Sequence, residues 1–206
     1  MGMKQKLLVT ILLAVLFLVQ CEKKETDESL LSPVEEQKIV AIGDTLSRRL
    51  INTLVLELTK AIQEGGPEHA ISVCNTTALQ LTSKVAQESG KQVNIKRTTR
   101  RYRNPANAPD RWEEAALAFF EKKIQQGESP AYMIQKIDKD GEIIYRYYKP
   151  LKVGTLCLSC HGNPDDISPA VLEELKKRYP EDHATGYQEG DFRGVIRVEM
   201  RGLLTR

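Results

Sequence analysis

Tyr132–Lys149 read YMIQKIDKDGEIIYRYYK, in which two runs of β-branched and aromatic residues lie on either side of Asp138-Lys139-Asp140-Gly141. Such runs are typical of strands, and an Asp-Gly pair suits the tight turn of a hairpin. The stretch therefore predicts two strands, over Tyr132–Asp138 and Glu142–Lys149. It decides the fold class, because strands joined by a tight turn run antiparallel.

A long helix is predicted before the hairpin. The start Ser32-Pro33-Val34-Glu35 is typical of a capped helix, and the helical pattern continues to Gly65-Gly66. About 30 residues of helix extend about 45 Å. We therefore expect this helix to project, to pair with another subunit or to bend near Gly43, and to pack on the core through its C-terminal half. The stripe predicted to face the core consists of Ile39, Gly43, Leu46, Leu50, Leu54 and Ala61.

Turn signals and apolar periodicity place the remaining elements. They are a helix over Pro67–Gly90, a strand over Gln92–Thr98, a helix from Asp110 to Gly127, a short helix from Ser168 to Tyr179 and a last strand over Phe192–Met200. Helices grouped around an antiparallel sheet predict an α+β fold. Residues 32–206 have the length of a single domain.

The first 31 residues predict export and a lipid anchor. Lys4 and Lys6 precede an apolar run over Leu7–Val19 that is too short to span a bilayer, and the run ends at Gln20-Cys21. This pattern is typical of a bacterial lipoprotein, with residues 1–20 removed, Cys21 acylated and residues 21–31 forming a charged linker. Gln20 departs from the small residue usual at that position, which leaves an uncleaved short anchor or a secreted form open. We expect the domain to face the periplasm.

Charge excludes one class of partner. Removing residues 1–20 takes away Lys4 and Lys6 and no acidic residue, so the 30 basic residues fall to the number of acidic ones, 28. A chain without excess positive charge is poorly suited to nucleic acid, because phosphate neutralisation dominates that affinity. The sequence also lacks a metal-site histidine pair, a nucleophile elbow and a phosphate loop. We therefore expect neither nucleic-acid binding nor catalysis.

The stretch Cys157-Leu158-Ser159-Cys160-His161 has the spacing of a c-type haem attachment site. In such a site two thiols bond to the vinyl groups of one porphyrin, and the adjacent imidazole binds the iron. The alternatives are a thioredoxin-like dithiol, half of a zinc site or a disulfide. A dithiol is expected in a βαβ unit, and a zinc site needs a second ligand pair. The motif therefore favours one covalently bound haem c.

Cys74 is the cysteine that neither lipidation nor haem attachment explains. Its helical spacing with Ile71, Ala78, Leu81 and Val85 turns it toward the core. It is either a small buried side chain or the sixth ligand of the iron. The competing ligands are His69, on another face of the helix, His183, in a polar turn segment, and Met133 and Met200, in predicted strands.

Five stretches of the chain together carry a family pattern. They are Ala70–Cys74, Arg101–Asp110 with Trp112-Glu113, Cys157–Gly162, Tyr179-Pro180 with Ala184–Tyr187, and Gly190–Gly194. Over about residues 35–202 the chain resembles a family of bacterial extracytoplasmic haem c proteins with a PAS-like domain, some of them sensor regions of histidine kinases. The resemblance implies an antiparallel PAS-like sheet with helices on one side and haem between them. It also implies that Cys74 is the axial ligand opposite His161.

A basic cluster follows the first predicted strand and consists of Lys96, Arg97, Arg100, Arg101 and Arg103. Partly buried haem propionates need charge-assisted hydrogen-bond donors. Arg97, Arg101 and Arg103 are therefore candidate propionate partners, and an ordinary solvated face is the alternative.

A His/Cys-ligated haem has a low potential and no open position for a substrate. The predicted function is redox or gas sensing, in which Cys74 leaves the iron on reduction or is displaced by NO or CO. The alternatives are an electron-transfer cytochrome c, and a PAS-like module that binds a small ligand and has a structural haem. Each role needs a redox partner or a signalling protein, and the long helix is a candidate homodimer contact.

Overall fold

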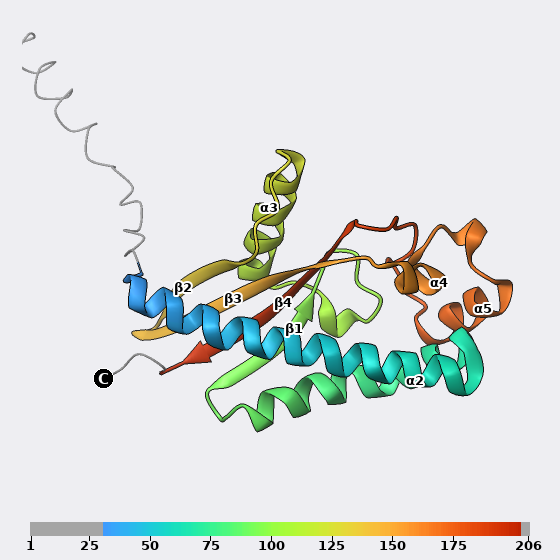
Figure 1. Ribbon diagram of the computed structural model, residues 1–206, viewed down its shortest axis with the longest axis horizontal. Coiled ribbons are helices and arrows are strands. Elements are labelled where there is room, and N and C mark those ends of the chain that lie inside the picture. The colour runs from blue at the N-terminus through green and yellow to red at the C-terminus, as the bar shows by residue number, and fades with distance from the viewer. Residues whose placement is uncertain (1–30, 203–206) are drawn as a thin grey trace, which may run out of the picture. The chain divides into compact units, whose positions relative to one another are not determined.

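The computed structural model describes residues 31–202, which form four α-helices, short 3₁₀ helices and a four-stranded sheet (Figure 1). The predicted signal peptide, the lipidation site Cys21 and the linker up to residue 30 lie outside the described residues. Within residues 31–202, no helix is long and apolar enough to cross a membrane.

The sheet is antiparallel throughout. Its strands are β1 Val93–Thr98, β2 Met133–Lys139, β3 Glu142–Lys152 and β4 Phe192–Arg201, in the order β1-β4-β3-β2. The predicted hairpin is β2–β3, and its turn residues Asp140 (φ 56°) and Gly141 (φ 84°) both have positive φ. This is the type I′ geometry, whose twist matches that of the strands. The predicted α+β fold with an antiparallel sheet is confirmed.

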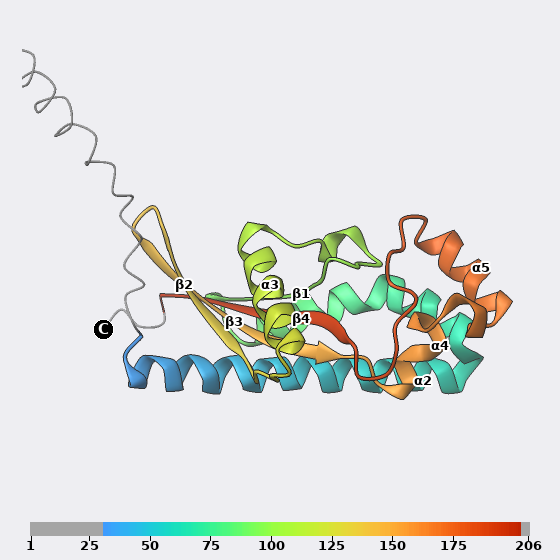
Figure 2. The same ribbon diagram turned by 90° about the horizontal axis from the view of Figure 1, so that it is seen from above.

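The long N-terminal helix α2, Pro33–Glu88, consists of two arms. The first arm begins at the predicted cap, where the Ser32 hydroxyl accepts from the Glu35 backbone N–H and the Glu35 carboxylate accepts from the Ser32 N–H. The pair Gly65-Gly66 leaves helical geometry, and Pro67 begins the second arm. The chain therefore turns back on itself at the predicted position (Figures 1 and 2).

Of the three alternatives expected for the first arm, the structure shows neither a projecting N-terminal half nor a bend near Gly43, and pairing with another subunit stays a prediction. Ile39 and Leu50 are buried, and Gly43 lies against the Tyr147 ring, where an added Cβ would be 2.2 Å from Cγ. The missing side chain at Gly43 lets the N-terminal half of the arm pack directly on β3, and the C-terminal half, which was expected to pack on the core, buries Ala61. Lys149 of β3 adds an ion pair to the arm, with its Nζ 2.6 Å from the Asp44 carboxylate.

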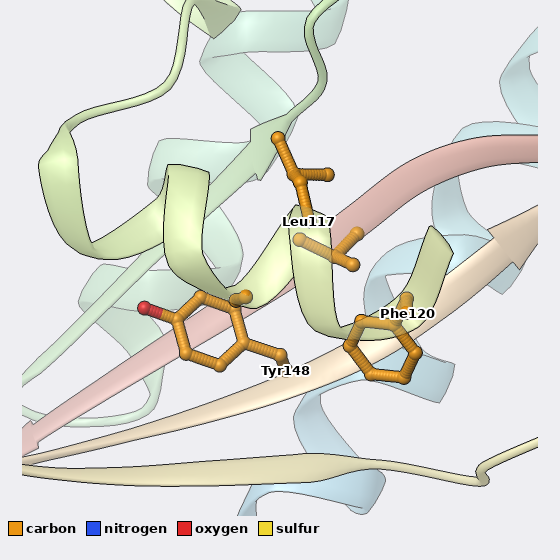
Figure 3. Close-up of a cluster of buried hydrophobic side chains, with 5 residues drawn as sticks. Leu117, Phe120 and Tyr148 are labelled. Atoms are coloured by element: carbon orange, nitrogen blue, oxygen red, sulfur yellow. The ribbon is translucent and has the colours of Figure 1, made fainter. Parts of the chain in front are cut away.

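Helix α3, Arg111–Gln125, covers the opposite face of the sheet. It begins at the predicted cap Asp110, and its residues Leu117 and Phe120 pack with Tyr148 in a buried cluster (Figure 3). Because neighbouring strand residues point to opposite faces, Tyr148 meets α3 whereas Tyr147 meets α2. The implied arrangement with the helices on one side of the sheet is therefore wrong for α3.

A network of buried charges lies between α3 and the sheet. The carboxylate of Glu113 lies 2.7 Å from Lys96 Nζ and 3.0 Å from Arg197 Nε. Glu199 in turn lies 2.7 Å from Arg197 and 2.9 Å from Arg146. Each of these buried groups has a partner of opposite charge, which is what a dry interior requires. We call these five residues the α3 network.

Two short helices lie beside the end of α2 where its arms meet (Figures 1 and 2). Helix α4 is Leu158–His161, and helix α5 is Pro169–Arg178. Helix α5 buries Val171 and Leu175 against Ile71 of the second arm. The 3₁₀ helices are Pro105–Asn107, Thr155–Cys157 and Pro164–Asp166.

Candidate haem site

A cavity of about 240 Å³ lies between α2, α4 and the ends of β1 and β4. Cys74, Cys157, Cys160 and His161, which the sequence singles out, all line it. The two arms of α2 supply an apolar wall, and the other lining residues include three arginines. The apolar wall includes Leu54, Leu58, Ile62, Ala70 and Ile71, and the arginines are Arg97, Arg103 and Arg193.

The attachment motif forms a tight helical turn at the cavity wall. Cys157 ends a 3₁₀ helix that continues into α4, and Gly162 closes α4 by donating to the Leu158 carbonyl at 2.9 Å. A Cβ at Gly162 would be 2.6 Å from that oxygen, so this turn needs glycine after the histidine. The turn presents both thiols and the imidazole to one cavity, which is the arrangement that covalent haem attachment needs.

His161 is held in one orientation by the segment Ala184–Tyr187. Its Nδ1 donates to the Ala184 carbonyl oxygen at 2.6 Å, and its own carbonyl accepts from the Tyr187 N–H at 2.9 Å. Burial, and after it the charge of Arg103, holds the pKa of His161 well below its usual value, so the ring is neutral at pH 7. A neutral ring that donates through Nδ1 has its lone pair on Nε2, ready for a metal.

Cys74 reaches the same cavity from the second arm of α2. Burial raises the pKa of its thiol, with Arg97 acting in the opposite direction. Burial likewise raises the pKa of Cys160. Both thiols are therefore protonated at neutral pH in the protein alone, and binding a metal through Cys74 releases a proton.

The competing ligands lie elsewhere. His69 is 45% exposed and lies 4.0 Å from the Glu64 carboxylate, and His183 packs edge-on against Tyr102. Met200 is fully buried in the sheet. None of these residues lines the cavity. Within residues 31–202 there is also no cluster of three or more His, Cys, Asp or Glu side chains that suits a protein-bound metal ion.

Two of the predicted propionate partners, Arg103 and Arg101, donate hydrogen bonds to backbone carbonyls. Arg103 donates to the Cys160 carbonyl at 2.5 Å and pairs with Asp182 at 3.0 Å, so it ties the attachment motif to the following loop. Arg101 does not line the cavity. Its guanidinium lies 3.9 Å from the Tyr187 ring centre and donates to the carbonyls of His183 and Thr185.

Arg97 and Arg193 differ from these two. Arg97, from β1, has a buried Nε without a hydrogen-bond partner, and neither side chain pairs with a carboxylate of residues 31–202. Burial lowers the pKa of both guanidinium groups. Arg193 was not predicted from the sequence, although it lies within Gly190–Gly194, one of the stretches that carry the family pattern. Its place at the start of the last strand was the available signal.

The donor set fits a c-type haem. Two cysteines and a neutral histidine with a free Nε2 lie on one wall, and a further thiol lines the same cavity from α2. The buried Nε of Arg97 has no hydrogen-bond partner among the described residues, so this wall leaves a donor for a polar group of the haem. A zinc site would need a second ligand pair, which the described residues lack.

Comparisons with known proteins identify a matching family and a similar fold. A family model described as Tll0287-like matches residues 19–201. The crystal structure of the cyanobacterial haem protein Tll0287 superimposes with a TM-score of 0.58 at 22% sequence identity, over 85% of this chain and 100% of that one. No curated protein matches the sequence.

Proposed function

The chain belongs to the Tll0287-like family, and from this premise we propose that its cavity binds one covalent haem c. Cys157 and Cys160 would form the thioether bonds, and His161, through Nε2, and Cys74 would hold the iron. The observation that carries the proposal is that these four side chains, from α2 and α4, line one cavity. The bound haem supplies a one-electron iron couple.

The protein residues set the properties of this site. The hydrogen bond from His161 Nδ1 to the Ala184 carbonyl fixes the tautomer and makes Nε2 a better donor. Cys74 donates as a thiolate, which favours the ferric state and lowers the potential. Apolar side chains of α2 line one side of the cavity, and low polarity favours the less charged form of a buried centre.

We place this protein among redox or gas sensors. Cys74 lies on the second arm of α2, and the first arm of the same helix packs on β3. A change of partner at Cys74, on reduction or on binding of NO or CO, therefore acts on the element that joins the cavity to the sheet. Signalling requires a partner protein, and the exposed Val55 and Leu56 of the first arm make homodimerisation through α2 part of the proposal.

Electron transfer is the second candidate. Leu156, next to Cys157 at the cavity wall, is 45% exposed. This exposure favours a porphyrin edge close to the surface, where a redox partner can approach. For either role we propose a periplasm-facing domain anchored through acylated Cys21.

The test is export of the chain in a bacterial strain with haem c maturation, followed by mass spectrometry of the intact protein. The proposal predicts a mass increase of one haem in the wild type and none in Cys157→Ser/Cys160→Ser. Wild-type protein without added mass would overturn it. Carbon monoxide then separates the two roles: a sensor binds it after reduction, whereas an electron-transfer protein keeps both ligands and does not.

A further inference from the structure

A second cavity adjoins the first. It has a volume of about 190 Å³ and shares with the first cavity the lining residues Arg97, Asn107, Cys157, His161 and Arg193. Its remaining wall includes Thr98, Thr99 and Lys152. Among the described residues, no aspartate or glutamate lines either cavity. The joint wall of the two cavities is therefore positively charged, and the nearby carboxylate of Asp182 is paired with Arg103.

The backbone brings the two shared arginines to this wall. Arg97 lies near the end of β1, and Arg193 lies near the start of β4, which pairs with β1. At Gly194 (φ 136°) an added Cβ would be 2.4 Å from the Thr98 carbonyl oxygen. Only glycine lets β4 approach β1 this closely, so Gly194 sets the place of Arg193 in the wall.

The donors of the two side chains are only partly used. Arg193 donates once to the Arg101 carbonyl, at 3.0 Å, and lies beside the Tyr187 ring. Arg97 makes no side-chain hydrogen bond to any of residues 31–202, and its buried Nε has no partner there. A guanidinium offers five donors in a planar fork that matches a carboxylate. Leaving a largely buried guanidinium unpaired is unfavourable, so an anion is expected to meet it.

We propose that Arg97 and Arg193 form a buried site for a carboxylate group. The carboxylate is either a propionate of the bound haem or a free small carboxylate in the second cavity, since both present the same planar anion. In its propionate form the inference rests on the proposed function, and it replaces Arg101 with Arg193 among the partners expected from the sequence. In its free form the site stands without haem.

Infrared difference spectra between the reduced and oxidised holoprotein test the propionate form. The haem is labelled with ¹³C at its propionate carboxylates, and the wild type is compared with Arg97→Gln, Arg193→Gln and Arg100→Gln. Arg100 is the control, because it pairs with Glu114 and Glu121 on the exposed side of α3. The proposal predicts a label-sensitive carboxylate band that shifts in the first two variants and stays in place in the control.

Acetate titration of the haem-free Cys157→Ser/Cys160→Ser protein tests the free form, with thermal unfolding as the readout. Loss of a charged hydrogen bond predicts at least about tenfold weaker binding in Arg97→Gln and Arg193→Gln. A shift of the label-sensitive band in the holoprotein supports the site, and so does weaker acetate binding by the haem-free variants. Arg97→Lys and Arg193→Lys, which keep the charge, replace a glutamine variant that does not fold.

The inference is overturned when the label-sensitive band stays in place in all variants and acetate does not stabilise the haem-free protein. Failure of the proposed function gives a different result, namely wild-type protein without covalent haem. In that case the acetate titration alone decides whether the site exists.

Discussion

The two faces of this domain treat buried arginines in opposite ways. On the α3 side, Arg197 and Arg146 lie within 3 Å of the Glu199 carboxylate, and Arg197 also meets Glu113. On the cavity side, Arg97 and Arg193 are half-buried, and neither forms an ion pair with a carboxylate among the described residues. The charges of the α3 network are matched by opposite charges within the protein, whereas we propose that a bound carboxylate matches those of the cavity wall.

This difference separates structural charge from functional charge. A buried ion pair that is satisfied inside the fold contributes to a single packed arrangement, and removing one partner leaves the other uncompensated. A buried charge without a partner lowers the stability of the protein alone and is retained where something binds. The predictions below test this comparison in order of decreasing effect.

The largest effect is expected from Glu113→Gln in the α3 network. The change removes the negative charge that faces both Lys96 and Arg197, so the free energy of unfolding should fall by about 3 kcal/mol. Urea denaturation measures it. The neighbouring Glu114, exposed and paired with Arg100, provides the control: Glu114→Gln should change stability by less than about 1 kcal/mol. Equal effects in the two variants would contradict the structural role of the network.

Much of the fold was predictable because its signals are local. The Asp140-Gly141 turn, the Ser32 cap and the Gly65-Gly66 break were all read from neighbouring residues, and each is confirmed. The relationship to the haem c family was also predictable, since its motifs are contiguous. The placement of α3 and of the first arm of α2 was not, because both depend on contacts between distant residues. The closeness of Gly43 to Tyr147 is one such contact.

The site shows the same division. Cys157, Cys160 and His161 are identified by their spacing alone, and the helical phase of Cys74 turns it toward the cavity in which the structure places it. The different roles of the arginines could not be predicted from the sequence. Arg101 and Arg103 hold carbonyls that come from residues 160 and 183–185, and Arg193 arrives from the last strand. Such pairings follow from tertiary structure.

A second prediction concerns the backbone that positions Arg193. Gly194→Ala combines positive φ with a Cβ 2.4 Å from the Thr98 carbonyl oxygen, and we expect a loss of about 2 kcal/mol in unfolding free energy. Gly90→Ala is the matched control, because Gly90 has φ 113° but open space around its Cβ. It should lose about 1 kcal/mol from strain alone. A loss in Gly194→Ala no larger than in Gly90→Ala would show that the close approach has no cost.

On the cavity side the comparison predicts the opposite sign. Replacing unpaired Arg97 by methionine in the haem-free Cys157→Ser/Cys160→Ser protein should raise the free energy of unfolding by about 1 kcal/mol, because an uncompensated buried charge is removed. Chemical denaturation at pH 7 measures the change, with exposed Arg100→Met as the control. Destabilisation by Arg97→Met of the size expected for Glu113→Gln would show that Arg97 already has a partner within the protein.

The smallest effect is the dependence of the α3 network on pH. Burial raises the pKa of Glu199, but the combined effect of Arg197, Arg201 and Arg146 lowers it by more than burial raises it. The pKa of Glu199 in the folded protein therefore lies below the ordinary value of 4.5. The group therefore adds stability above that value and loses it as the pH falls through the folded pKa. Between pH 6 and pH 3 the wild type should lose more stability than Glu199→Gln. Identical pH profiles would remove Glu199 from the account.

The central claim is that the cavity binds a haem between His161 and Cys74, and absorption spectra test it most directly. Ferric and dithionite-reduced spectra are recorded for exported wild type, Cys74→Ala and the control Ser72→Ala. The account predicts a covalent haem with a ferric thiolate-type spectrum in the wild type and in Ser72→Ala, which is lost in Cys74→Ala. An unchanged spectrum in Cys74→Ala would contradict thiolate ligation, and a wild type without bound haem would contradict the whole assignment.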